Sequence, residues 1–154
     1  MDCPIELAEA HAWEDMYAAA PASFRDLHAL EAAHVGGALV LTSRGLHLAH
    51  FNSVLGAGAM GAVDVSEIVA RFAPGTRFYF HAVEGDAVES LLAARGLRVA
   101  SSWDRVIRGG EPLDGAWDFA GIECVTAETA AEWAAFIDGV YHLPTGPWLQ
   151  SFAV

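Results

Sequence analysis

Three glycines between residues 56 and 61 have the spacing of a loop that binds the pyrophosphate of a dinucleotide. The segment FNSVLGAGAMG, residues 51–61, contains Gly56-x-Gly58-x-x-Gly61. In such a loop the glycines let backbone N–H groups approach phosphate oxygens at the start of a helix, where those groups lack partners. Glu84 follows the next predicted strand, roughly where an acid would hold the ribose. Dinucleotide binding is therefore one hypothesis for this loop.

Two features of the neighbouring sequence argue against a phosphate site. The preceding segment, 47–55, carries histidine, asparagine and serine, whereas the strand ahead of a dinucleotide loop is covered on both faces and is almost wholly apolar. Asp64 followed by Glu67 is typical of a capped helix start, and carboxylates there would repel phosphate. We therefore favour an interpretation in which the glycines allow a tight turn and a close approach to a neighbouring strand or helix.

Other polar residues of this region also have a structural interpretation beside a chemical one. Asn52 could line a cleft, but we favour a buried asparagine that binds strand-end carbonyls. His47 and His50 are three apart on a predicted strand, so their side chains point to opposite faces and make poor joint metal ligands. His81 lies in an apolar strand and is interpreted as a core histidine.

The cysteines and the remaining histidines add no recognisable catalytic pattern. Cys3 and Cys124 are the only cysteines and lie far apart, so they suggest neither a disulfide framework nor a zinc knuckle. No Ser-His-Asp or Cys-His arrangement has local support in the sequence. We assign no catalytic residue, no cofactor-binding residue and no metal ligand.

The composition argues against two classes of partner. The net charge is −12 and all eight basic residues are arginine, so a nucleic acid, which needs clustered cations, is not expected, whereas a cationic small molecule would be attracted. No stretch of about 18 residues is free of polar side chains, so no membrane span is expected. The first 15 residues are acidic and lack the features of a secretion signal, which predicts a cytoplasmic location.

The pattern of apolar residues predicts a mixed α/β layer fold. A hairpin is expected to turn around Arg44-Gly45, strand 77–83 is expected to be central, and Gly96 is expected to close a helix. The predicted elements, in chain order, are helices 5–20 and 23–33, strands 38–43 and 47–55, a helix from Asp64 to Pro74-Gly75, strand 77–83, a helix from Asp86 to Gly96, strands 97–108 and 121–126, and helix 127–140.

A change in charge and composition predicts two domains. Six of the eight arginines lie between residues 71 and 108, while residues 111–154 carry seven acids and no arginine or lysine. We therefore expect a domain over 1–110, a linker over 111–118, and the first strand and helices of a second, truncated domain over 119–154. A truncated domain exposes apolar surface, so we expect self-association into a homo-oligomer.

The order of these segments resembles a known superfamily. FNSVLGAG, followed by a helix, the strand RFYFHAV, the helix AVESLLAARGL and the strand RVASSWDRVIR, resembles the N-terminal half of tandem-domain GCN5-related N-acetyltransferases, the GNAT superfamily. Residues 119–154 resemble the opening of a second domain of the same kind. The resemblance implies a central mixed sheet flanked by helices and, for the intact enzyme, acetyl transfer from acetyl-CoA to a small-molecule amine acceptor.

The chain departs from the superfamily at the loop that would hold the pyrophosphate. The resemblance implies a Gln/Arg-x-x-Gly-x-Gly/Ala loop at a helix start, but VLGAGAMG lacks the leading residue, and acids follow it. Residues 1–154 are therefore expected to be non-catalytic alone and to bind no acetyl-CoA, with the working loop outside them. A non-enzymatic small-ligand-binding or regulatory module remains the alternative. The substrate-side candidates are Phe51, Asn52, Gly56, Gly58, Tyr141, His142 and Trp148.

Overall fold

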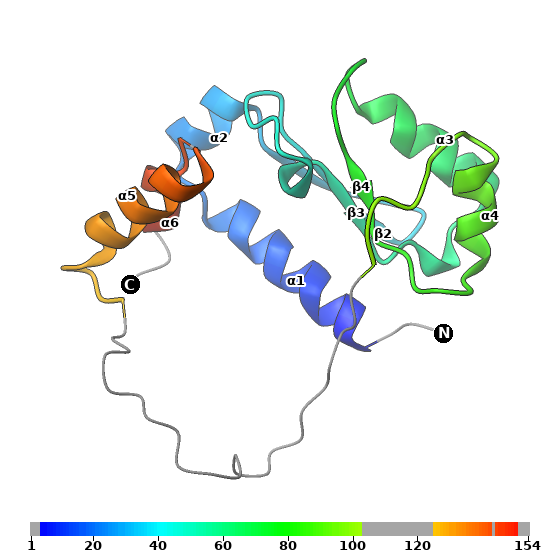
Figure 1. Cartoon of the computed structure of the whole chain (residues 1–154), viewed down its shortest axis with the longest axis horizontal. Helices are drawn as coiled ribbons and strands as arrows, with labels where there is room; N and C mark the ends of the chain where they lie inside the picture. The colour runs from blue at the N-terminus through cyan, green and yellow to red at the C-terminus, as the bar shows by residue number, and fades with distance from the viewer. Residues whose placement is uncertain (1–3, 103–124, 143, 151–154) are drawn as a thin grey trace, which may run out of the picture. The chain divides into compact units, whose positions relative to one another are not determined.

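The structure is a computed structural model that describes residues 4–102, 125–142 and 144–150 (Figure 1). The chain divides into two compact units, Met1–Ser101 and Ser102–Val154. The expected linker, 111–118, lies outside the described residues. In the described part of the chain, every helix falls short of the length or apolarity needed to cross a membrane.

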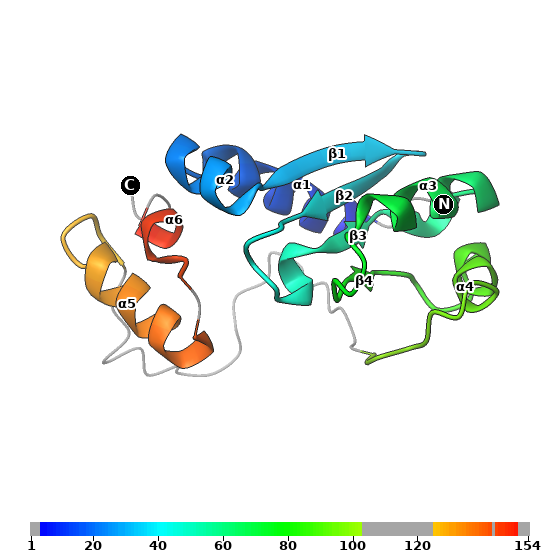
Figure 2. The same ribbon diagram turned by 90° about the horizontal axis from the view of Figure 1, so that it is seen from above.

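The first unit is built on a mixed sheet. Its strands are β1 (Glu31–Val35), β2 (Ala38–Thr42), β3 (Ser53–Leu55) and β4 (Tyr79–Phe80), and they lie side by side in that order (Figure 2). The pairs β1–β2 and β2–β3 are antiparallel, whereas β4 is parallel to β3. The parallel pair follows from the helical crossover between β3 and β4. The expected mixed α and β fold class is confirmed at this level.

Two helices form the core on one face of this sheet. They are α3 (Ala62–Arg71) and α4 (Ala87–Ala93). Val40 and Val54 are register partners and therefore face the same way. Both belong to a buried cluster with Val65 and Ile68 of α3 and Val88 of α4. Burial of such aliphatic side chains, each worth about 1.5–3 kcal/mol, is what holds α3 and α4 to the sheet.

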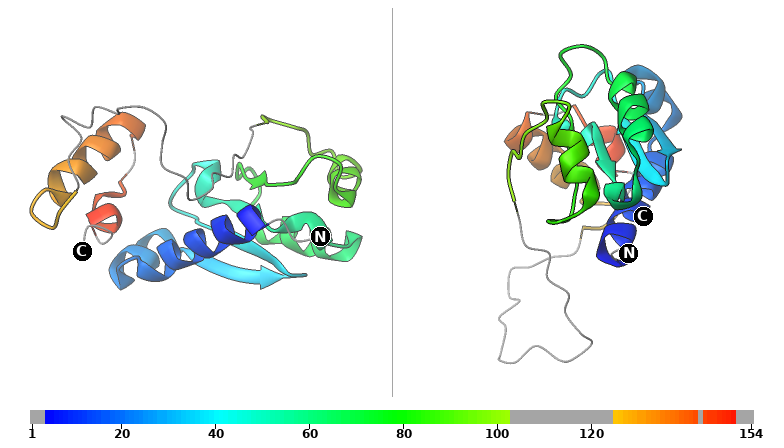
Figure 3. Two further views of the ribbon diagram at one scale, coloured as in Figure 1. Left: turned by 90° about the horizontal axis from the view of Figure 1, so that it is seen from below. Right: turned by 90° about the vertical axis from the view of Figure 1, so that its right-hand side faces the viewer.

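The opposite face of the sheet is covered by α1 (Pro4–Ala19). Leu39 and Leu55 are also register partners, one position along from the previous pair, so they point away from α3 and are fully buried. Helix α1 contacts β1 and β3, and the sheet lies between α1 and the α3–α4 pair (Figure 1; Figure 3). This double covering explains why β2 is apolar along both faces.

The N-terminal helices are predicted well up to residue 28. The predicted helix 5–20 is confirmed as α1, and the second helix begins as expected but, as α2 (Ala22–His28), ends five residues early. Ala29 takes a left-handed conformation, with φ of 48°, and residues 31–35 form β1. The prediction was wrong there because pairing with β2 outweighs the helical spacing of the local sequence.

The tight hairpin turn lies at Gly36-Gly37 and not at Arg44-Gly45. It joins β1 to β2 through Gly36 and Gly37, whose φ angles of 58° and 87° are the positive values that a two-residue hairpin turn requires. β2 and β3 do pair antiparallel, but through residues 43–52, which include the short 3-10 helix η1 (Ala49–Phe51). The expected tight turn at Arg44-Gly45 was wrong, and only residues 53–55 of the predicted strand 47–55 form a strand, because no sequence signal marks this longer connection.

The later elements of the first unit are shorter than predicted. Only Tyr79 and Phe80 of strand 77–83 are paired, and β4 lies at the end of the sheet among the described strands, not at its centre. Helix α4 follows Asp86 as predicted, and Gly96 has the expected positive φ, 77°. Residues 97–102 form no strand, and residues 103–108 lie outside the described residues.

The second unit contains two described helices. Helix α5 (Ala130–Tyr141) confirms the predicted helix 127–140 with a start three residues later, and the short helix α6 (Gly146–Gln150) was not predicted. Of the predicted strand 121–126, residues 121–124 lie outside the described residues, and Val125 and Thr126 form no strand.

Candidate functional site

The glycine loop joins the end of β3 to the start of α3. Gly56 follows β3 directly in a left-handed conformation, with φ of 72°, which glycine adopts without strain. A 3-10 turn, η2 (Ala57–Ala59), then leads to Gly61, the N-cap of α3. Beside the loop, the backbone N–H of His81, the residue after β4, donates to the carbonyl of Val54 at 2.9 Å. The loop therefore lies where two parallel strands end.

The start of α3 is capped by its own carboxylate. Asp64 Oδ2 accepts the N–H of Gly61 at 2.9 Å. The helix begins at Ala62, so Asp64 is the third helical residue and not the N-cap that the sequence suggested. The same carboxylate lies against the β1–β2 turn, because a Cβ placed on Gly36 would come within 2.5 Å of Asp64 Cγ. Asp64 thus occupies the position where an anion would meet the helix start.

A second carboxylate lies against the middle of the loop. A Cβ placed on Gly58 would come within 2.7 Å of Asp86 Oδ2. Asp86 is the N-cap of α4, but its side chain accepts no hydrogen bond from that helix. Glu89 supports the helix start instead, because its carboxylate accepts the N–H of Gly85 at 3.2 Å. The glycine at position 58 therefore permits a close approach to α4, as the structural interpretation of the loop expects.

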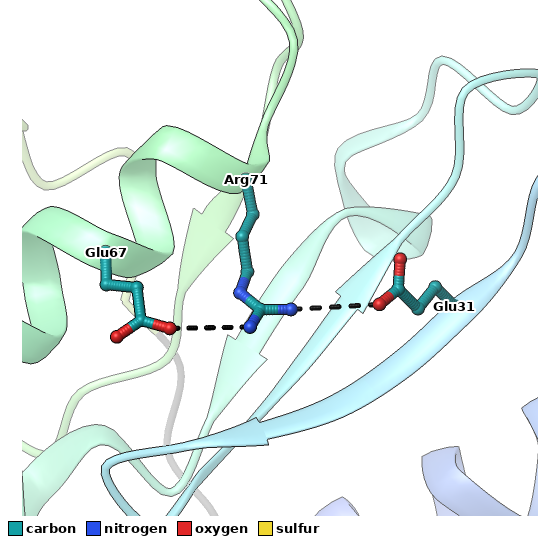
Figure 4. Close-up of polar contacts among 3 residues, drawn as sticks. All are labelled: Glu31, Glu67 and Arg71. Carbon is teal, nitrogen blue, oxygen red and sulfur yellow. Dashed lines mark hydrogen bonds and ion pairs between the residues drawn. The ribbon is translucent and has the colours of Figure 1, made fainter.

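The predicted capping pattern required the Glu67 side chain to lie at the helix start. In the structure it contacts an arginine instead. Arg71 lies one turn further along α3 and reaches Glu67 Oε1 at 3.4 Å and Glu31 Oε1 at 3.7 Å (Figure 4). The arginine thus bridges two carboxylates and links α3 to β1. The predicted pair of Asp64 and Glu67 was wrong in register, since the true pair is Gly61 and Asp64.

Together the two aspartates make the loop a poor anion site. A pyrophosphate is normally held by unpaired N–H groups at a helix start, aided by the helix dipole. Here one such N–H already binds Asp64, and Asp86 approaches from the other side of the loop. Two negative charges within a few ångströms of a phosphate oppose its binding by Coulomb repulsion. The geometry therefore favours a loop whose role is structural.

Asn52 closes the connection between β2 and β3. It is 1% exposed. Its Oδ1 accepts the N–H of Ser43 at 2.9 Å, and its Nδ2 donates to the carbonyls of Leu46 and Leu48 at 2.9 and 3.3 Å. The side chain therefore replaces the ladder hydrogen bonds that a regular strand would have made. This is the structural role favoured from the sequence for this substrate-side candidate.

Phe51 is held by two aromatic residues of α1. Its carbonyl accepts the hydroxyl of Tyr17 at 2.8 Å, and its ring lies edge-on to Trp13 with centroids 6.3 Å apart. Burial raises the pKa of the Tyr17 hydroxyl far above its usual range, so the group remains a donor. Tyr17 was not singled out from the sequence, where it is one apolar residue among several on the helix.

The second-unit candidates have different environments. Trp148 in α6 is 1% exposed, whereas Tyr141 ends α5 with 60% exposure and His142 follows it with φ of 54°. Asp138 connects the two helices, because Oδ1 accepts the N–H and hydroxyl of Thr145 at 2.9 and 2.6 Å and Oδ2 accepts the Gly146 N–H at 2.6 Å. Trp148 is therefore buried, and Tyr141 and His142 are the accessible candidates of this unit.

The three histidines considered from the sequence have separate surroundings. His81 is partly buried, with Nδ1 3.9 Å from Glu9 Oε1 of α1. His50 packs edge-on to Tyr79 with centroids 5.6 Å apart, and His47 is exposed. Among the described residues, no three or more His, Cys, Asp or Glu side chains lie in a group that could hold a metal ion.

The chain was compared with protein-family models, with curated proteins and with solved structures, and none of them matched.

Proposed function

We propose that this chain is the N-terminal part of a GNAT-type N-acetyltransferase and that its first domain is a degenerate, non-catalytic copy. The order strand, glycine loop, helix, strand, helix over residues 53–93 supports the proposal, because the resemblance implies this order. The intact enzyme would transfer an acetyl group from acetyl-CoA to an amine. The amine, deprotonated to its neutral form, attacks the thioester carbonyl; the C–S bond then breaks, the nitrogen loses a proton to a base, and the departing thiolate is protonated to the coenzyme A thiol.

One observation carries the non-catalytic assignment of the first domain. Asp64 accepts the Gly61 N–H at the start of α3, where a pyrophosphate-binding loop would keep that donor for the ligand. Asp86 adds a second negative charge at Gly58. The chain also lacks the leading Gln or Arg of the superfamily loop. Acetyl-CoA binding is therefore assigned to a loop outside residues 1–154.

The acceptor is an amine that is positively charged in solution. The chain has a net charge of −12, which raises the local concentration of a cation near its surface. In the second unit, the exposed Tyr141 offers an aromatic face and a hydroxyl to such a group.

The decisive assay uses the polypeptide made from the intact natural reading frame, with acetyl-CoA and a panel of primary amines and polyamines. The proposal predicts release of coenzyme A thiol that depends on an amine. It also predicts that Asp64→Asn within that polypeptide leaves kcat unchanged, because the first-domain loop takes no part in the chemistry. Absence of amine-dependent thiol release, together with no binding of acetyl-CoA to the same polypeptide, would contradict the proposal.

A non-enzymatic binding or regulatory module is the second candidate, and the same loop favours it. The Gly61 N–H is bound by Asp64 of α3 and is therefore not available to a coenzyme. The outcome that contradicts the acetyltransferase would support this module.

Dinucleotide binding, the third hypothesis, is the least supported. β3 is antiparallel to β2 on one side, whereas a dinucleotide loop follows a strand of a parallel sheet. A rise in the midpoint temperature of thermal unfolding when NAD or NADP is added would favour this hypothesis.

A further inference from the structure

A cavity separate from the glycine loop lies between the second half of α1, α2 and the start of β1. Its volume is about 270 Å³ and it is partly open to solvent. This is just below the range of about 300–1,000 Å³ that is typical of small-molecule pockets, so its occupant is small. The cavity lies wholly within the first unit and is lined by Glu14, Tyr17, Ala18, Arg25, Leu30 and Ala32.

Opposite charges line this cavity without neutralising each other. Arg25 Nη1 donates to the carbonyl of Ala18 at 2.9 Å, which orients the guanidinium. No ion pair joins Arg25 to a carboxylate among the residues that the structure describes. Glu14 Oε1 lies 3.1 Å from Nε2 of His34, at the edge of β1. Arg25 and Glu14 therefore line the same small space and form no ion pair with each other.

The lining decides the charge of the ligand. A ligand with only a negative charge would be attracted by Arg25 but repelled by Glu14. A ligand with only a positive charge would be attracted by Glu14 but repelled by Arg25. A molecule with both charges satisfies both side chains, because a guanidinium binds a carboxylate through paired N–H groups and a carboxylate accepts from an ammonium. Tyr17 and Leu30 also line the cavity and supply apolar surface.

We propose that this cavity binds a small zwitterion of the α-amino-acid class. The ligand's carboxylate lies on Arg25, its ammonium lies on Glu14, and its apolar side chain packs against Leu30 and Tyr17. The site is formed by α1, α2 and β1 and uses no residue of the glycine loop. It therefore stands or falls independently of the proposed acetyl transfer.

The first test compares three matched probes on the whole ¹⁵N-labelled chain by NMR. L-leucine carries both charges, L-leucine methyl ester lacks the carboxylate, and N-acetyl-L-leucine lacks the ammonium. L-leucine is expected to shift the amide signals of Tyr17, Ala18 and Ala32 saturably in the millimolar range. Each singly charged probe is expected to bind roughly fivefold more weakly, the scale of one partly exposed charged contact. Equal shifts with all three probes, or no saturable shift with L-leucine, would overturn the proposal.

The second test removes each charge from the protein. Arg25→Gln and Glu14→Gln are each expected to weaken L-leucine binding by the same roughly fivefold factor. Arg44→Gln and Asp15→Asn remove exposed charges of the same kinds away from the lining and are expected to leave the affinity unchanged. Equal losses in the control variants would show a general charge effect and refute the site. The probe comparison on the unmodified chain decides the question if a variant fails to fold.

Discussion

Asp64 Oδ2 lies 2.9 Å from the backbone nitrogen of Gly61, so the helix after the glycine loop is closed by a side chain of its own first turn. This contact turns a sequence that looks like a phosphate loop into a self-capped helix start. Mutation of Asp64 removes this hydrogen bond, and its contribution to the free energy of unfolding can then be measured.

Asp64→Ala is expected to lower the free energy of unfolding by about 1 kcal/mol, because it leaves the Gly61 N–H without its partner. Urea denaturation followed by circular dichroism measures the change. Asp15→Ala on the exposed side of α1 is the matched control, with an expected change within about 0.5 kcal/mol. An unchanged midpoint for Asp64→Ala would mean that the cap contributes nothing.

Gly58→Ala tests the second carboxylate of the loop. The new Cβ would lie 2.7 Å from Asp86 Oδ2, the free end of a side chain that makes no capping bond, so Asp86 rotates away at an expected cost of no more than about 1 kcal/mol in unfolding free energy. In the double variant with Asp86→Ala, most of that cost is expected to disappear, and a double-mutant cycle measures the coupling. Additive effects of Gly58→Ala and Asp86→Ala would refute the close approach.

Asn52→Ala is expected to be the most damaging of these substitutions. It leaves the buried N–H of Ser43 and the carbonyl of Leu46 without partners, at a cost of about 2–4 kcal/mol. Asn52→Asp keeps the Oδ1 acceptor but loses both donated bonds, so it is also expected to destabilise. If Asn52→Ala unfolds at the same urea concentration as the unmodified chain, the residue does not hold this connection.

The burial of the Tyr17 hydroxyl is expected to make the chain unfold at alkaline pH. Burial raises the pKa of its hydroxyl in the folded chain above the unfolded value of about 10. The stabilisation from keeping this phenol protonated is complete below that value and is lost as the pH rises beyond it. The phenolate absorbance of Tyr17 should therefore appear together with unfolding, and that step should be missing in Tyr17→Phe. Ionisation of Tyr17 well before loss of circular dichroism would contradict its burial.

The sequence predicts those elements whose signals are local. The helix over residues 5–20, the start of α4 after Asp86 and the turn at Gly96 depend on spacing and terminal residues, and all three are found in the structure. β1 was missed because residues 31–35 are held by pairing with β2, a contact that no local pattern reveals. The hairpin was assigned to Arg44-Gly45, although Gly36-Gly37 is the pair with two positive φ angles.

The negative charge around the glycine loop was predictable from the sequence, but the contacts of the individual carboxylates were not. The acids after the glycine loop were recognised as opposing a phosphate, but the sequence paired Asp64 with Glu67. The structure pairs Asp64 with Gly61 and directs Glu67 to Arg71. Asp86 and Gly58 are 28 residues apart in the sequence but close in the structure. Glu14 and Arg25 line the same cavity only because of the way α1, α2 and β1 pack. Contacts of this kind come from tertiary structure and have no counterpart in spacing.

The most direct test is a calorimetric titration of residues 1–154 with acetyl-CoA, repeated with the ¹⁵N-labelled chain to follow the amide signals of Gly56, Gly58 and Gly61. With Asp64 and Asp86 against the loop, we expect no binding at micromolar concentrations and no movement of these three signals. A micromolar dissociation constant accompanied by shifts of the three glycine amides would contradict the account.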